Sequence, residues 1–122
     1  MKYVVLSALF LAACGADPLF GPPTESVCPT GSTLTYDNFG KPFAESYCTR
    51  CHSSELVGAE RMGAPTFHDF DTQFGIQAVA DHIDEVAAFG PAAENHSMPP
   101  DGDRPTAEER RLLGEWIACG AP

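Results

Sequence analysis

The chain has 122 residues, a length that suits one small domain and is too short for two. Seventeen acidic and seven basic residues give a formal net charge of −10, which excludes nucleic acid as a partner because phosphate binding needs a basic surface. An acidic surface is usually only a solvated one, although it can also steer a basic or electron-exchanging protein into contact.

The first thirteen residues are typical of a targeting segment. Lys2 supplies a positive charge, and the apolar run over 3–13 is too short to span a bilayer as a stable helix. The run ends in Leu-Ala-Ala before Cys14, which resembles a bacterial lipobox and implies cleavage before Cys14 and a lipid on that cysteine. Ordinary secretion with cleavage nearby is the alternative. Both interpretations place the domain outside the cytoplasm, in the cell envelope, facing the periplasm or the outer surface.

Residues 14–35 contain four prolines among small and polar residues, and this composition predicts a short, extended tether. The domain itself is expected over 36–120. Loss of residues 1–13 removes Lys2, so six basic and seventeen acidic residues leave a formal charge of −11.

A first helix is expected to run into the cysteine pair that follows. Phe39, Phe43 and Tyr47 recur every four residues and form one aromatic face. Asp37 or Asn38 is the expected N-cap, which leaves Pro42 within the first turn, where a missing N–H is tolerated.

The next stretch, Cys48-Thr49-Arg50-Cys51-His52, places two thiols and an imidazole on about one helical turn. This spacing is that of covalent haem attachment, in which each thiol forms a thioether with a vinyl group and the histidine binds the iron. A redox dithiol would need a βαβ pattern, and structural zinc would need a second pair of ligands; neither pattern occurs in the sequence. A plain disulfide would leave His52 without a role. The motif resembles that of c-type cytochromes.

The resemblance implies that a proline about a dozen residues after the histidine orients the imidazole. Pro65 stands there, and its carbonyl would accept the Nδ1 proton of His52 and fix the ring. A simple turn at Pro65 is the alternative. Further along, the apolar residues between 76 and 87 follow helical spacing, bounded by Gly75 and by Gly90-Pro91.

The segment 90–105 is rich in Pro, Gly, Asn and Asp and predicts a loop. It contains Met98 followed by two prolines, which resembles the distal-ligand loop of cytochromes c and implies that Met98 is the sixth iron ligand. A thioether is a neutral, soft ligand that favours ferrous iron. His96, two residues away, and Met62 are rival ligands.

The last helix is expected over 106–119, with a capping box formed by Thr106 and Glu109 and a stop at Gly120. Gly114 inside it is expected to allow close approach of another helix. In cytochromes c the last helix crosses the first through an aliphatic and an aromatic residue three apart, and Leu113 and Trp116 match that pair.

Two cysteines remain after Cys14 and the haem cysteines are assigned. Cys28 and Cys119 lie at opposite ends of the expected domain, and a disulfide between them would join its termini. Two buried free thiols are the alternative. Export from the cytoplasm permits the disulfide.

The sequence therefore predicts an all-α protein that resembles a class I-like cytochrome c, with three to four helices around one covalent haem. The resemblance implies a one-electron carrier, not an enzyme, with redox proteins that carry a basic docking surface as partners and a lipid as its contact with the membrane. Two other functions stay open. An open sixth site would make a gas sensor or peroxidase-like protein, and the domain could instead be the haem subunit of a membrane oxidoreductase.

Overall fold

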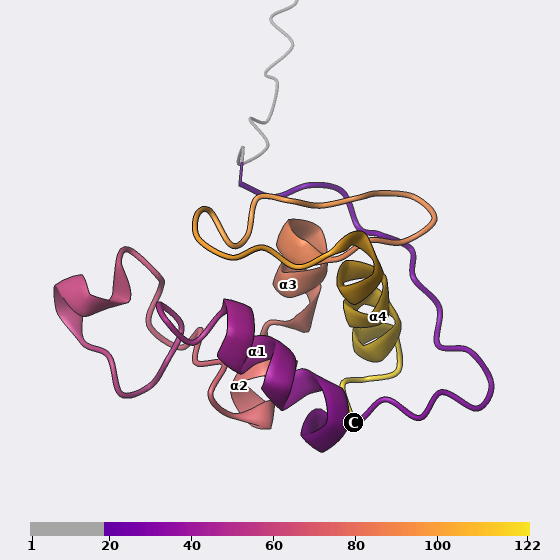
Figure 1. Cartoon of the computed structure of the whole chain (residues 1–122), viewed down its shortest axis with the longest axis horizontal. Helices are drawn as coiled ribbons and strands as arrows, with labels where there is room; N and C mark the ends of the chain where they lie inside the picture. Colours follow the sequence, from indigo (N-terminus) through magenta and orange to yellow (C-terminus); the bar gives the residue numbers. More distant parts are fainter. Residues whose placement is uncertain (1–18) are drawn as a thin grey trace, which may run out of the picture.

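A computed structural model describes residues 19–122, and the regular elements of this part are all helical. They are, in chain order, η1 (Tyr36–Gly40), α1 (Lys41–Tyr47), η2 (Gly58–Arg61), α2 (Gln73–Ala78), α3 (Ala80–Ala87) and α4 (Ala107–Ala118) (Figure 1). The only extended pairing in residues 19–122 is one isolated bridge between Phe89 and Glu94. The predicted all-α class is confirmed for these residues.

The predicted targeting segment and Cys14 lie outside the described residues. Within residues 19–122, every helix is too short or too polar to cross a bilayer.

The first helix begins with a wide π turn, η1, and not at the expected cap. Thr35 is the N-cap: its hydroxyl accepts from the Asn38 amide at 3.2 Å, and the Asn38 side chain accepts from the Thr35 amide at 2.8 Å. The prediction of a cap at Asp37 or Asn38 is therefore wrong. Pro42, the second residue of α1, has no N–H for the preceding turn, and a wider turn before it relieves the clash with the proline ring.

The first and last helices meet at Trp116, which is 1% exposed. The Phe39 and Trp116 rings are 5.9 Å apart, edge to face, and a Cβ on Gly40 would clash with the Trp116 ring. The elements cross this closely because Gly40 has no side chain. Leu113, three residues before Trp116, is also buried, so both residues of the predicted contact pair lie in the core.

The last helix begins and ends as the sequence predicts. The Thr106 hydroxyl accepts from the Glu109 amide at 3.2 Å, and the Glu109 carboxylate accepts from the Thr106 amide at 2.7 Å. Gly120 follows with a φ of 88°, a left-handed conformation that glycine adopts without strain.

The predicted single helix between Gly75 and Gly90 is two short helices instead. The break falls at Val79, whose φ of −133° and ψ of 30° are not helical. Gly75 is not the boundary: it lies inside α2, where a Cβ would clash with the Asp69 carbonyl. The helix starts earlier because the Thr72 hydroxyl accepts from the Gly75 amide at 3.0 Å.

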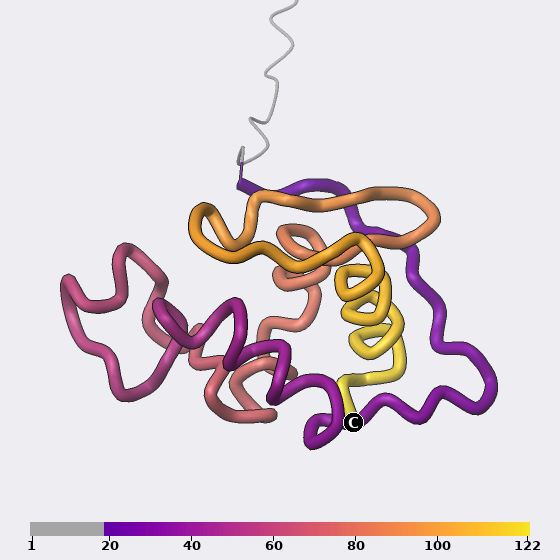
Figure 2. The backbone as a smooth tube through the Cα atoms, viewed as in Figure 1, coloured from indigo at the N-terminus to yellow at the C-terminus, as the bar shows by residue number. Residues whose placement is uncertain are grey.

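Residues 19–35, assigned above to a tether, pack on the domain (Figure 2). Thr24 is fully buried, and both its amide and its hydroxyl donate to the Asp84 carboxylate on α3. Near the start of the segment, the Ser97 hydroxyl donates to the Leu19 carbonyl at 2.6 Å. Phe20 and Leu34 also pack against the core. Residues 19–35 are therefore attached to the domain and are not the extended tether that their composition predicts.

Gly114 allows the N-terminal segment to pack closely on α4. A Cβ at Gly114 would clash with the Ser26 hydroxyl and come within 3.0 Å of the Phe89 carbonyl. The close approach that Gly114 permits is therefore to residue 26 and the residue 89 backbone, not to another helix as the sequence analysis expects.

A disulfide joins Cys28 to Cys119, with Cα atoms 4.7 Å apart. It fixes the N-terminal segment to the end of α4, as the sequence analysis expects for a pairing of these two cysteines.

Peptide mapping without reductant is expected to recover Cys28 and Cys119 in one linked pair of peptides that separates on reduction. The double variant Cys28→Ser and Cys119→Ser should lower the free energy of unfolding by about 4 to 5 kcal/mol, because the unfolded chain loses a long closed loop. Recovery of both cysteines as alkylated single peptides before reduction would contradict the pairing.

Gly40→Ala should lower the free energy of unfolding by about 1 to 3 kcal/mol, because the new methyl group overlaps the Trp116 ring and neither can move without loss of packing. Glu45→Ala, on the exposed side of α1, is the matched control and should change stability by less than about 0.5 kcal/mol. Urea unfolding measures both. Equal stabilities would mean that the helices do not cross at Gly40.

Candidate cofactor site

The motif at 48–52 forms a tight turn directly after α1. The Cys48 amide still donates to Ala44 at 2.8 Å, and the amides of Cys51 and His52 both donate to the Cys48 carbonyl, at 3.1 and 2.9 Å. The two thiols and the imidazole thus project from one tight turn of the backbone. Cys48 and Cys51 are the free thiols among the described cysteines, so both remain available for a covalent bond to a cofactor.

The two thiols differ in their surroundings. Cys48 packs against the apolar core, and burial raises the pKa of its thiol to about 12, an effect that the nearby Arg110 charge only partly offsets. A thiol with this pKa stays protonated at neutral pH and is a poor redox nucleophile. Cys51 lies beside Met62, with the two sulfur atoms 3.6 Å apart. These surroundings disfavour a role of the two cysteines in thiol–disulfide exchange.

The His52 ring is held on two sides. It stacks on Phe70 with ring centroids 4.5 Å apart, and its Nδ1 lies 3.2 Å from the His68 carbonyl oxygen. A carbonyl can only accept, so this bond requires the proton on Nδ1. Burial lowers the pKa of the imidazole, which favours its neutral form. Nε2 makes no hydrogen bond within residues 19–122, and its lone pair is the one that a metal would take.

The resemblance implies that the Pro65 carbonyl lies beside Nδ1 of His52, and this prediction is wrong. The carbonyl beside Nδ1 belongs to His68. The Pro65 carbonyl instead accepts from Nη2 of Arg61 at 2.7 Å. The loop folds back through two residues with left-handed backbone, Met62 and Phe67, with φ values of 51° and 72°. This path brings the carbonyl three residues beyond Pro65 to the imidazole.

Arg61 organises this loop, and the sequence analysis does not single it out. Its side chain is 6% exposed and lies 2.9 Å from the Asp69 carboxylate. Its guanidinium donates to backbone carbonyls at distances of 2.6 to 3.2 Å, namely those of Ser53, Ala64, Pro65 and His68. An arginine in a glycine-rich loop ordinarily points to solvent, so no local pattern could have indicated this role.

Met98 is fixed by its backbone on both sides. Its amide donates to the Val86 carbonyl at 2.9 Å, and its carbonyl accepts from Nη1 of Arg110 at 3.0 Å. The side chain is partly buried against the core, and the bond to Pro99 is cis. These bonds fix the backbone from which the Met98 side chain extends.

The two rival ligands are less well placed. His96 is exposed and lies 2.9 Å from the Glu94 carboxylate, which competes for Nε2. The Met62 side chain lies beside Cys51, on the loop that already supplies the carbonyl for His52, and the residue is 60% exposed. The structure therefore favours Met98 over both as a second ligand.

The motif and the Met98 loop lie side by side. Arg110, which is 1% exposed, donates to the Met98 carbonyl, and its charge acts on the Cys48 thiol. On the surface, Arg50 within the motif forms an ion pair with Asp101, three residues beyond Met98. One buried and one exposed arginine thus connect the two predicted ligand segments.

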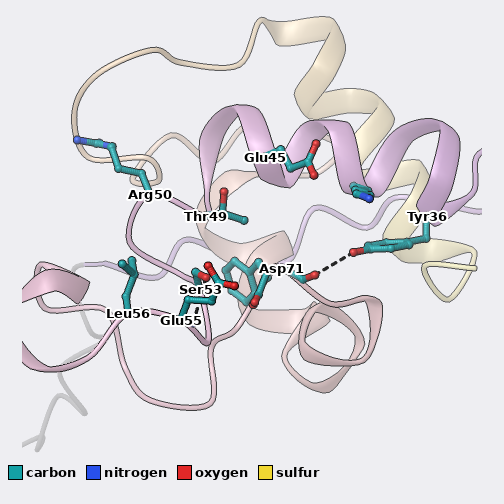
Figure 3. A pocket seen from close by; sticks show the side chains of 10 residues that line it. Tyr36, Glu45, Thr49, Arg50, Ser53, Glu55, Leu56 and Asp71 are labelled. Atoms are coloured by element: carbon teal, nitrogen blue, oxygen red, sulfur yellow. Dashed lines mark hydrogen bonds between the residues drawn. The ribbon is translucent and has the colours of Figure 1, made fainter.

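A surface groove of about 570 Å³ lies between α1 and the turn after the motif (Figure 3). Its lining is mostly polar and charged and includes Lys41, Glu45 and Asp71. Thr49 and Arg50 are the only motif residues that line it, and Met98 does not. This groove is therefore not the candidate cofactor site.

The residues at the motif fit an apolar, metal-bearing cofactor such as haem. The loop after His52 exposes three large apolar side chains, Val57, Met62 and Phe67, by 60 to 84%. One of them, Met62, lies directly beside Cys51. No group of three protein metal ligands occurs within residues 19–122, but haem iron takes only one or two ligands from the protein.

The described residues thus define an all-α domain in which a free thiol pair, a neutral histidine and a fixed methionine lie on adjacent segments. In comparisons with known proteins, the chain matches no family model, no curated protein and no solved structure.

Arg110→Met should lower the free energy of unfolding by about 2 to 4 kcal/mol, because three backbone carbonyls, of Ala87, Asn95 and Met98, lose their buried donor. Arg111→Met, the neighbouring but exposed position, is the control and should stay within about 0.5 kcal/mol of the unmodified protein. Urea unfolding distinguishes them. Equal effects would show that the Met98 loop does not depend on Arg110.

Proposed function

We propose that the protein is a one-electron carrier of the class I-like cytochrome c type, with one haem bound covalently to Cys48 and Cys51. The observation that carries this proposal is the state of His52. Its imidazole directly follows two free thiols, is held neutral by burial, and uses Nδ1 on a backbone carbonyl, so that Nε2 is left for iron.

The haem would supply the one-electron couple of its iron. His52 would bind on one side and Met98 on the other, and a neutral thioether ligand favours the ferrous state. Hydrogen bonds hold the backbone of Met98, and its sulfur would fill the sixth position and exclude small molecules. A protein with both positions filled transfers electrons and does not bind a substrate, so we propose no enzymatic activity.

The proposed location is the bacterial cell envelope, with a lipid on Cys14 as membrane anchor. Seventeen acidic residues against six basic ones, once residues 1–13 are removed, would favour redox partners with a basic docking surface. The association would then weaken as salt is raised.

Absorption spectra of protein exported in a host with haem-maturation machinery test the proposal. The ferric protein should show the far-red band of iron bound by a methionine sulfur, and the ferrous protein should not bind CO. Met98→Ala should lose the band and bind CO, because the sixth position opens.

Met62→Ala is the matched control, since it removes a methionine from the proximal loop, and it should keep both properties. CO binding by the unmodified protein would favour a gas sensor or a peroxidase-like protein. Absence of covalent haem would refute the proposal at its first step.

A further inference from the structure

The His68 carbonyl accepts two donors at once. Nδ1 of His52 lies 3.2 Å from its oxygen, and Nη2 of Arg61 lies at the same distance from the same atom. The oxygen has two lone pairs, so both bonds can form together. The hydrogen bond that orients the proposed iron ligand is therefore shared with a cation.

A guanidinium on this oxygen weakens it as an acceptor for the imidazole. The cationic donor draws electron density from the carbonyl, so less remains to bind the Nδ1 proton. A histidine whose Nδ1–H bond is weaker is a less basic ligand, because strong acceptors at Nδ1 are what raise ligand basicity. A less basic ligand stabilises ferric iron less and so raises the reduction potential.

The charge of Arg61 acts in the same direction. Its side chain is almost completely buried, and the nearest carboxylate oxygen, Oδ1 of Asp69 at 2.9 Å, is buried as well. A buried positive charge close to the ligand opposes the additional charge of ferric iron. The negative charge of Asp69 opposes this effect and lowers the reduction potential.

We propose that Arg61 is a positioning residue that sets the ligand strength of His52 through the shared His68 carbonyl and thereby raises the reduction potential of the protein. This inference rests on the proposed function. Arg61 would act through the His68 carbonyl, since its guanidinium donates to that oxygen and not to the His52 ring.

Arg61→Met removes both the donor and the charge. In spectroelectrochemical titration, the one-electron reduction equilibrium constant should fall by about threefold to tenfold, where tenfold is about 59 mV. Asp69→Asn should shift the constant in the opposite direction, because the charge of Arg61 is then unopposed. Arg61→Lys, which keeps the charge, should fall between Arg61→Met and the unmodified protein.

A second measurement reports on the hydrogen bond itself. The ¹⁵N shift of His52 Nδ1 in the diamagnetic ferrous protein should move toward that of a stronger Nδ1–H bond in Arg61→Met. Arg111→Met, at an exposed position on α4, makes the same change of charge and should alter neither the shift nor the potential.

The inference is overturned if Arg61→Met and Asp69→Asn both have the same reduction potential and the same Nδ1 shift as the control Arg111→Met. Arg61 would then only stabilise the loop. If Arg61→Met does not acquire haem, the other two variants test the inference. The reduction potential should rise in Asp69→Asn and fall in Arg61→Lys, and unchanged potentials in both would overturn the inference. Failure of the proposed function is separate: the unmodified protein would then carry no covalent haem, and no potential could be measured.

Discussion

The crossing of the first and last helices is the contact on which the rest of the structure depends. Gly40 lets the aromatic face of the first helix reach Trp116, and this contact fixes the direction in which α1 ends. The thiol pair and His52 follow that end within one turn. The Met98 loop leads into the other helix of the pair, so the two candidate ligands lie on segments joined to the same crossing.

Two buried arginines extend this arrangement into loops that have little regular structure. Arg61 donates hydrogen bonds to several carbonyls of the loop after His52, and Arg110 donates to those of the loop around Met98. A loop carbonyl buried without a donor is costly, and one guanidinium can satisfy several of them. In these loops the two guanidinium groups supply the donors to buried carbonyls that backbone amides supply in helices.

Most local signals predicted the structure well, although the N-cap lies at Thr35 and not at Asp37 or Asn38. Among long-range contacts, the disulfide between Cys28 and Cys119 and the burial of Leu113 and Trp116 agree with expectation, and others do not. The capping box at Thr106, the stop at Gly120 and the turn of the motif depend on neighbours in the chain, and these expectations agree with the structure. The His68 carbonyl, the packing of residues 19–35 and the break at Val79 depend on contacts with distant segments, which no spacing in the sequence encodes. The identity of the bound group and the location of the protein remain proposals drawn from the motifs.

The disulfide between Cys28 and Cys119 also changes how the chain responds to proteolysis. The exposed loop after the motif carries Phe67 at 84% exposure, and exposed loop tips are preferred sites of cleavage. A single cut there would leave two fragments, one carrying the thiol pair and His52 and the other carrying Met98. Because each fragment contains one cysteine of the disulfide, they would stay covalently joined, and a nicked molecule would keep both halves of its candidate site together.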